Sequence, residues 1–304
     1  MIDMRESMTA KMCSFARAYH SNHARQKIFD DYLAYDMMGK EEYEEVGMIL
    51  QNTFGITQSP LQTDFSGKLT YPLIDHYLTP ILLSRIAYAE TELMNFANKH
   101  GKSQYVICGA GMDTFAFRNP NTDIRIFELD HPDTQRYKME KIQKLEWTIP
   151  QNVQYVPIDF SKHDLVETLK DAGFDPLVPT YFAILGVTYY LTLPVFEETI
   201  QKIAALSIPG NKIVFDYPDE TTFGENPVER VYRLTQATES LGEQMKQGLE
   251  FADVKAALGR HHFSVEAHLN PERIQNAYFA NRTDGQKAFE NIHLILANKE
   301  EGTV

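Results

Sequence analysis

The feature that most constrains the fold is a short apolar run that ends in two glycines, from Tyr105 to Gly111. The apolar residues predict a buried strand, and the Gly-x-Gly turn predicts that this strand feeds a helix through a tight loop. Glycine can adopt a positive φ at such a turn, and it places no Cβ between the backbone and a ligand. The pattern favours a nucleotide-binding loop at Gly109, Ala110 and Gly111.

A second strand is predicted from Ile124 to Asp130, and it ends in an acid where nucleotide-binding folds contact the ribose hydroxyls. A lone Gly-x-Gly is also compatible with a structural turn. The third glycine of the dinucleotide fingerprint is replaced by Thr114. Because that glycine serves close helix packing near a pyrophosphate, its loss favours a ligand without phosphates, such as S-adenosylmethionine, over NAD.

Further strands alternate with predicted helices along the rest of the chain. This alternation predicts a doubly wound α/β sheet, whose ligands lie at the carboxyl ends of its strands. A continuous apolar run around residues 180–191 predicts a central strand covered on both faces. Residues 180–191 are predicted to form this strand and its exit, and the other predicted strands span residues 153–158, 211–217, 262–269 and 291–297.

Two runs, Cys108 to Thr114 and Phe127 to Gln135, resemble the signature of the leucine carboxyl methyltransferase family. The resemblance is closer to its bacterial branch, which is similar to the O-methyltransferases of tetracenomycin-type polyketide synthesis, and it extends from Ser7 to Ala297. It implies a Rossmann-like class I methyltransferase with S-adenosylmethionine as cofactor. The implied sheet is seven-stranded and mostly parallel, with an antiparallel last strand.

The resemblance also implies two parts, a helical N-terminal extension over residues 1–98 and a cofactor-binding core over residues 99–304. In the family the extension covers the cofactor and substrate pocket. From the residues alone, a packing subdomain without ligand contacts fits equally well. Turns are predicted near Gly39 and Gly55 and between Ser59 and Pro72.

Arg85 borders the apolar face of a helix predicted from Pro80 to Ala97, where a guanidinium needs an anionic partner. One partner is the carboxylate of the methionine moiety, which suits a planar bidentate donor. The other is a protein acid, such as Glu92 or one elsewhere in the fold. The resemblance favours the cofactor carboxylate.

Asp159 and Phe160 follow the strand at 153–158, where an acid and a backbone N–H can recognise adenine. The alternative is that Asp159 caps a helix beginning near His163. The resemblance places Asp159 and Phe160 at adenine. It also places Leu185 beside the cofactor, at a position where many members carry a glutamate. We interpret this leucine as a sign of a more apolar substrate, with neutral drift or lost activity as alternatives.

Methyl transfer to oxygen is an in-line displacement that needs alignment and exclusion of water, and it requires no metal. A carboxylate acceptor is already ionised near neutral pH, whereas a phenol, with a pKa near ~10, would benefit from a general base. The candidates for catalysis are Tyr190 and His20, followed by His131 and Asp216. His131 is also predicted to cap the next helix, whose lysines Lys138, Lys141 and Lys144 are predicted to face solvent.

Composition limits the binding partners and the cellular location that the sequence predicts. The formal net charge of −13 disfavours nonspecific attraction to nucleic acid or anionic lipid. Two cysteines, no signal-peptide pattern and no long apolar run predict a cytoplasmic protein without a membrane segment. The histidines show no zinc-ligand spacing.

Three functions compete at this point. The favoured one is an S-adenosylmethionine-dependent O-methyltransferase that acts on a carboxylate or phenolic hydroxyl of a small molecule. The others are a noncatalytic module that binds the same cofactor and an NAD-dependent oxidoreductase, which Thr114 disfavours.

Overall fold

The structure is a computed structural model that describes residues 8–54, 62–63, 69–70, 72–242 and 244–302. Within these residues, its centre is a seven-stranded sheet of order β5-β4-β3-β6-β7-β9-β8. The strands are parallel except for β9, which is antiparallel to both β7 and β8. The predicted Rossmann-like sheet with an antiparallel last strand is therefore confirmed. The strands are β3 Ser103–Cys108, β4 Ile124–Asp130, β5 Val153–Pro157, β6 Thr180–Ile184, β7 Lys212–Pro218, β8 Phe263–Leu269 and β9 Ile292–Lys299.

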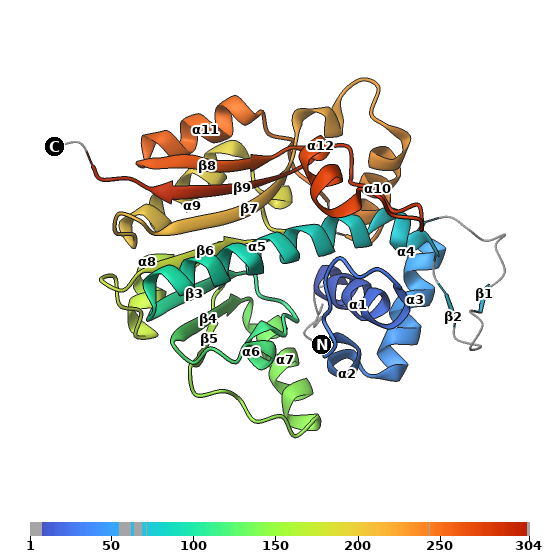
Figure 1. The fold of residues 1–304 in the computed structure, drawn as a ribbon, viewed down its shortest axis with the longest axis horizontal. Coiled ribbons are helices and arrows are strands. Elements are labelled where there is room, and N and C mark those ends of the chain that lie inside the picture. The colour runs from blue at the N-terminus through green and yellow to red at the C-terminus, as the bar shows by residue number, and fades with distance from the viewer. Residues whose placement is uncertain (1–7, 55–61, 64–68, 71, 243, 303–304) are drawn as a thin grey trace.

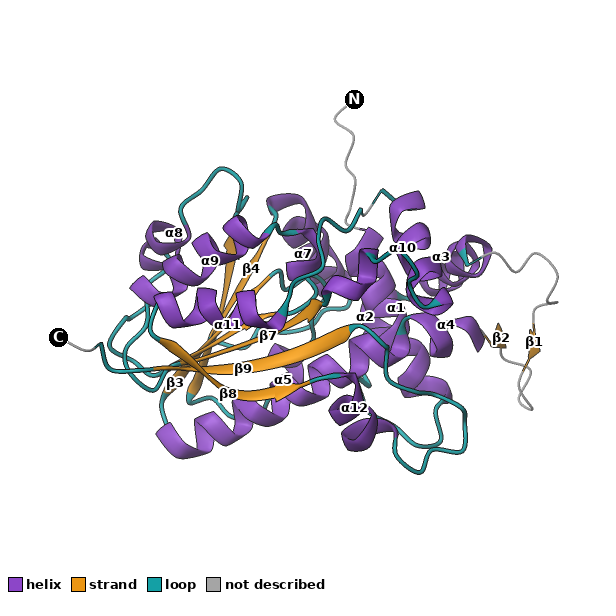
Figure 2. Ribbon diagram, turned by 90° about the horizontal axis from the view of Figure 1, so that it is seen from above, coloured by secondary structure: helices purple, strands orange, loops and turns teal. Residues whose placement is uncertain are grey.

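Helices cover both faces of the sheet, which is why β3 and β6 are buried along their whole length. On one face, α8, α9 and α11 pack against Val106 and Phe182. On the other, α5 and α12 pack against Ile107 and Ala183. Figure 2 shows the strands between these two layers. The helices are α5 Thr79–His100, α8 Leu165–Asp171, α9 Leu193–Ala205, α11 Phe251–Arg260 and α12 Pro271–Ile274.

Local sequence signals account for most helix positions. Helix α9 begins directly after Thr192 and buries Phe196, Ile200 and Ile203 at steps of three and four residues. The helix predicted after the glycine loop, α6 (Phe115–Arg118), is a single turn. The next crossover helix, α7 (Pro132–Lys144), begins with proline at its first position, where the missing N–H costs no hydrogen bond.

Lys138 of α7 contradicts the predicted solvated face, because its side chain is buried and pairs with the buried carboxylate of Glu128. Its ammonium also lies 5.6 Å from the centre of the Tyr155 ring. Burial raises the pKa of Glu128 to about 7, although Lys138 opposes that rise. A lysine is tolerated in this core because a strand on the facing layer supplies the opposite charge. Lys141 is also partly buried, with its ammonium 2.6 Å from a carboxylate oxygen of Glu42.

The N-terminal helices gather at one end of the sheet, coloured blue in Figure 1. They pack with α10 (Glu229–Ser240) around a shared apolar cluster that includes Phe15, Leu50 and Val231. The second half of α5 packs on the sheet instead, so a domain boundary at residue 98 stays a prediction. The helices are α1 Met8–His23, α2 Ala34–Met38, α3 Lys40–Thr53 and α4 Pro72–Tyr77.

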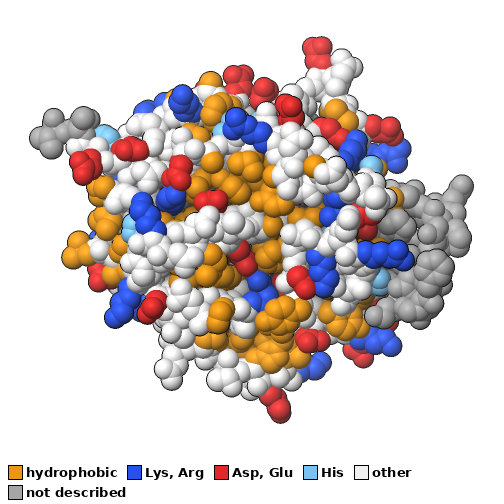
Figure 3. All heavy atoms as spheres, in the orientation of Figure 1, with side chains coloured by type: hydrophobic (Ala, Val, Ile, Leu, Met, Phe, Trp, Pro, Cys, Tyr) orange, Lys and Arg blue, Asp and Glu red, His pale blue; other side chains and the backbone are white. Residues whose placement is uncertain are grey.

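The predicted turn at Gly39 is confirmed, since this residue has a φ of 79° between α2 and α3. Gly55 and most of the predicted turn from Ser59 to Pro72 lie outside the described residues, apart from the short antiparallel pair β1 (Gln62–Thr63) and β2 (Leu69–Thr70). Among the helices described, none is both long and apolar enough to cross a bilayer. On the face drawn in Figure 3, Lys and Arg side chains are scattered among acidic ones.

Candidate active site

A cavity of about 270 Å³ lies where β3, β4 and β6 end, between these strand ends and helices α1 and α5. Ligands of parallel α/β sheets bind at this edge. Most of the predicted cofactor residues meet here, together with one of the two main catalytic candidates. The predicted residues that line the cavity are Arg85, Gly109, Ala110, Gly111, Asp130, Leu185 and Tyr190.

The glycine loop after β3 follows the backbone requirement read from the sequence. Gly109 and Gly111 have φ values of +80° and +52°. A Cβ on Gly109 would lie 2.8 Å from a methyl carbon of Val187, and one on Gly111 would lie 3.3 Å from the Cβ of Ala10. Both the positive φ and the close neighbours therefore favour glycine at these positions.

Asp130 ends β4 beside this loop. One carboxylate oxygen accepts a hydrogen bond from the Gly111 N–H at 2.5 Å, and the other accepts from the His131 N–H at 2.7 Å. Burial raises the pKa of Asp130, and these two hydrogen bonds offset part of the rise. The carboxylate is thereby held at the cavity wall by the loop itself.

Arg85 pairs with a protein acid, as the alternative interpretation expected, but the acid is Asp216 at the end of β7 rather than Glu92. The Nη1 of Arg85 lies 3.0 Å from a carboxylate oxygen of Asp216, and Nη2 lies 3.6 Å from the Sγ of Cys13. Burial lowers the pKa of Arg85, but Asp216, with Cys13 and Tyr189, raises it by more in sum. Arg85 stays charged, and its Nε is buried without a partner.

Asp216 is occupied by three donors. It accepts from Arg85, from the Tyr189 hydroxyl at 2.7 Å and from the Gly186 N–H at 2.7 Å. Gly186 has a φ of +72°, and a Cβ there would lie 2.5 Å from Nη2 of Arg85. This arrangement makes Asp216 an anchor for Arg85 and leaves it poorly placed to accept a proton from an acceptor hydroxyl.

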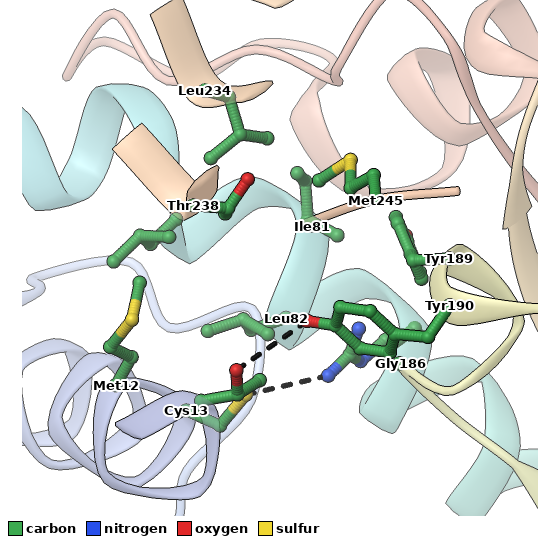
Figure 4. A pocket seen from close by; sticks show the side chains of 13 residues that line it. Met12, Cys13, Ile81, Leu82, Gly186, Tyr189, Tyr190, Leu234, Thr238 and Met245 are labelled. Atoms are coloured by element: carbon green, nitrogen blue, oxygen red, sulfur yellow. Dashed lines mark hydrogen bonds between the residues drawn. The ribbon is translucent and has the colours of Figure 1, made fainter. Parts of the chain in front are cut away.

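A second, smaller cavity of about 60 Å³ adjoins the first (Figure 4). The two share Thr9, Cys13, Arg85, Gly186 and Tyr190. At this junction the hydroxyls of Tyr190 and Thr9 lie 3.4 Å apart. The rest of the smaller cavity is mostly apolar, lined by Met12, Leu78, Ile81, Leu82, Tyr189, Leu234, Thr238 and Met245.

Asp159 and Phe160 lie outside both cavities. Phe160 lines a separate cavity of about 130 Å³, which meets the first through Val187. Asp159 accepts from the Ser161 N–H at 3.0 Å and pairs with Lys162 at 2.6 Å. The hydrogen bonds from Lys162 and Ser161 lower its pKa. Asp159 is not the cap of the next helix, because Asp164 holds that position for α8.

The two histidine candidates have structural surroundings. His20 is fully buried, and its Nε2 accepts the Ile28 N–H at 2.8 Å. Burial lowers the pKa of His20 to about 4, so this ring is neutral near pH 7. His131 caps α7, as predicted, by accepting the Asp133 N–H. Neither histidine lines the two joined cavities.

Helix α1 contributes side chains to the wall of the larger cavity, and the sequence analysis did not identify these residues. Thr9, Cys13 and Arg17 lie at four-residue steps on one face of α1, and all three line the larger cavity. That spacing was readable in the sequence, but it did not show that this face turns toward a ligand. Among the residues described, no group of three or more His, Cys, Asp or Glu side chains could hold a metal ion.

Comparisons with known proteins show which family this chain resembles in sequence. The sequence model of the family named leucine carboxyl methyltransferase matches residues 10–204. A Bacillus subtilis protein that carries the name S-adenosyl-L-methionine-dependent methyltransferase YktD is 36% identical over 301 residues, which is 97% of this chain and 98% of that protein. A Parafrankia relative with the same kind of name is 27% identical and covers 83% of this chain and 75% of its own length.

Two solved structures share the fold at low sequence identity. A DUF574 family protein from Streptomyces avermitilis superposes with a TM-score of 0.60 at 11% identity, over 98% of this chain and all of that one. A protein from Thermobifida fusca, titled a methyltransferase, gives a TM-score of 0.59 at 13% identity over 94% of both chains.

Proposed function

This chain belongs to the leucine carboxyl methyltransferase family and is an S-adenosylmethionine-dependent methyltransferase, and we propose that it methylates a carboxylate or phenolic oxygen of a small molecule. The observation that carries this proposal is the junction of the two cavities at Arg85, Tyr190 and Thr9. The larger cavity has the glycine loop and acid that suit a nucleoside, and the smaller one offers an apolar pocket for an acceptor.

In the proposed arrangement, the backbone at Gly109, Ala110 and Gly111 lies against the cofactor, and Asp130 accepts from the ribose hydroxyls. The fit is supported by the place of all three residues in the cavity lining, and by the positive φ of Gly109 and Gly111, which turns the loop backbone along the cavity wall. Asp130 is held in place by two backbone donors and still lines the cavity.

The methionine carboxylate is proposed to contact Arg85. Asp216 holds one nitrogen of the guanidinium, whereas Nη2 has only a long contact with a thiol. A carboxylate would give this nitrogen a stronger, charge-assisted hydrogen bond. Leu185 is proposed to lie beside the cofactor, in the same cavity lining.

Adenine is proposed to extend from Asp130 past Val187 toward Asp159 and Phe160. Val187 lines both the cofactor cavity and the cavity that contains Phe160. Phe160 is 43% exposed, so part of its ring is available to cover a base. The backbone N–H and carboxylate in this turn provide the donor and acceptor that adenine requires.

When bound, the cofactor supplies an electrophilic methyl group on a sulfonium. The chain contributes alignment, since the two cavities meet at one place, and exclusion of water, since the smaller cavity is mostly apolar. The Tyr190 and Thr9 hydroxyls are placed to orient the attacking oxygen at the junction. An ionised carboxylate needs no further activation, whereas Asp216 and His20 are poorly placed to deprotonate a phenol.

A screen for transfer of a labelled methyl group tests this function. The library contains small apolar carboxylic acids, phenols, amines and thiols. We expect turnover on members of the first two classes, and no turnover by Asp130→Ala. Transfer only to nitrogen or sulfur nucleophiles would overturn the proposed acceptor chemistry.

A further inference from the structure

A buried cluster of charges connects the N-terminal helices to the glycine loop. We call it the Asp31 cluster, and it consists of Arg17, Asp31, Glu90, Thr114 and Arg118. Two guanidinium groups face two carboxylates, so the formal charges balance, and Asp31 itself is 1% exposed. The Asp31 cluster lies outside the two joined cavities, except for Arg17, which lines the larger one.

Asp31 gathers donors from three separate elements. One carboxylate oxygen lies 2.8 Å from Nε of Arg17 on α1. The other accepts the Thr114 hydroxyl at 2.6 Å, from the loop after β3, and lies 3.4 Å from Nε of Arg118 on α6. Arg118 places its two remaining nitrogens on Glu90 of α5, at 3.0 and 2.5 Å. The segment between α1 and α2 is thus fastened to the core through one carboxylate.

The same cluster reaches the wall of the cofactor cavity. Nη2 of Arg17 donates to the carbonyl oxygen of Met112 at 2.5 Å, and both residues line that cavity. Two turns earlier on α1, Ala10 packs so closely against Gly111 that a Cβ on this glycine would lie 3.3 Å from the Cβ of Ala10. Helix α1 therefore covers the glycine loop, and Asp31 fixes the arginine that holds it there.

We propose that Asp31 is a positioning residue for cofactor binding, which it serves by holding α1 against the glycine loop through Arg17 and Thr114. This inference rests on the proposed placement of S-adenosylmethionine in the larger cavity. It also gives a role to Thr114, the residue that replaces the third glycine of a dinucleotide loop. The Thr114 hydroxyl donates to Asp31 and accepts from Arg118.

Removing the charge of Asp31 leaves Arg17 buried without its acidic partner, which disfavours the docked position of α1. A ligand that requires the docked position then binds with an apparent Kd equal to its intrinsic Kd divided by the fraction of molecules that keep that position. We expect Asp31→Asn to weaken S-adenosylhomocysteine at least tenfold. Thr114→Val, which keeps the shape and removes the hydroxyl, is expected to weaken it severalfold, and Thr114→Ser much less.

Calorimetric titration with S-adenosylhomocysteine and hydrogen exchange of the free and bound full-length protein test this inference. The expected result is faster exchange of α1 amides in free Asp31→Asn and Thr114→Val, with β3 and β6 amides unchanged. Thr168→Val is the matched control, because the Thr168 hydroxyl bonds only to Asp164 O within α8. This control should bind as wild type does.

Unchanged affinity and unchanged α1 exchange in both Asp31→Asn and Thr114→Val would overturn the inference, as would faster exchange throughout the sheet, which indicates a general structural role. Wild-type protein that binds no S-adenosylhomocysteine would overturn the proposed cofactor cavity, and this inference with it. Wild-type binding with unaffected variants would overturn the inference alone.

Discussion

The two joined cavities are built by different means. The larger one is formed by backbone at strand ends, by glycines with positive φ and by paired charges. The smaller one is formed mostly by apolar side chains from α1, α5, α10, the segment after α10 and the segment after β6. The first is therefore set by the geometry of the sheet, whereas the second can change shape through side-chain substitutions alone.

This difference suggests that members of the family share the cofactor cavity and differ in the acceptor pocket. A cofactor shared by a family needs the same loop and acid in each member. The proposed acceptor pocket, which includes Met12, Leu82 and Met245, can be altered without moving a strand. Substitutions in the larger cavity should therefore change cofactor binding, and substitutions in the smaller cavity should change acceptor selection. Substitutions of the charged residues at the junction should change both.

The largest effect is expected at that junction, for Asp216→Ala. This variant leaves Arg85 buried without its carboxylate partner and removes the acceptor of the Tyr189 hydroxyl. Breaking a buried pair in this way costs about 3–5 kcal/mol. Urea unfolding should show a decrease of that size in the free energy of unfolding.

A double variant, Arg85→Met with Asp216→Ala, is the control for that result, because it removes both charges. It should be more stable than Asp216→Ala alone. If the single variant unfolds at the same urea concentration as wild type, Asp216 does not anchor Arg85.

The second effect concerns the cofactor side only. Wild-type protein at a hundredfold excess of S-adenosylmethionine over its Kd gains about 2.7 kcal/mol of stability. Asp130→Ala should lose most of the corresponding thermal shift, because it removes the proposed ribose acceptor. An unchanged shift in this variant would remove Asp130 from the ribose site.

The sequence predicted the sheet well because periodic burial is a local property. The strand at 124–130 and the buried face of α9 follow from residues that are close in the chain. The glycine loop was predictable for the same reason, since backbone conformation at Gly109 and Gly111 depends on immediate neighbours.

Pairings between distant elements were harder to predict. Lys138 looks like a solvated residue until a buried Glu128 from β4 faces it, and Arg85 could not be matched to Asp216, which lies 131 positions away. For the same reason, the sequence predicted a helical extension over the pocket without showing which face of α1 lines it. Only the position of α1 against the glycine loop shows that its face with Thr9, Cys13 and Arg17 lines the larger cavity.

The third prediction tests whether Arg85 contacts the cofactor as well as Asp216. Arg85→Lys keeps a positive charge and loses the planar fork, so it should weaken S-adenosylmethionine by ~1–2 kcal/mol. Calorimetry with S-adenosylmethionine and its decarboxylated analogue measures this loss. If wild type and variant discriminate equally between the two ligands, Arg85 does not bind the carboxylate.

A fourth, smaller effect is expected for Leu185→Glu, which introduces the acid that the family resemblance implies at this position. Leu185 is half-buried and packs against an apolar cluster that includes Ile107 and Ala89. Placing a carboxylate there should cost about 1 kcal/mol or keep the side chain protonated, and so lower the melting temperature. We expect no activity on a protein C-terminal leucine. Full stability together with tighter cofactor binding would show that the site still suits an acid.

The smallest effect on the cofactor is expected for a change confined to the acceptor side. Met245 lines only the smaller of the two joined cavities and is half-buried. Met245→Ala enlarges that cavity without touching the glycine loop, Asp130 or Arg85. Cofactor affinity should stay within roughly 0.5 kcal/mol of wild type, as for independent sites, while the KM ranking of acceptors of different length shifts toward longer ones.

Met139→Ala is the control, because Met139 is a half-buried methionine that packs in a different cluster, near Ile142. It should change neither the cofactor affinity nor the acceptor ranking. If Met245→Ala weakens S-adenosylmethionine as much as Arg85→Lys does, the two cavities are not separable. The apolar pocket would then form part of the cofactor site, and the acceptor would have to enter elsewhere.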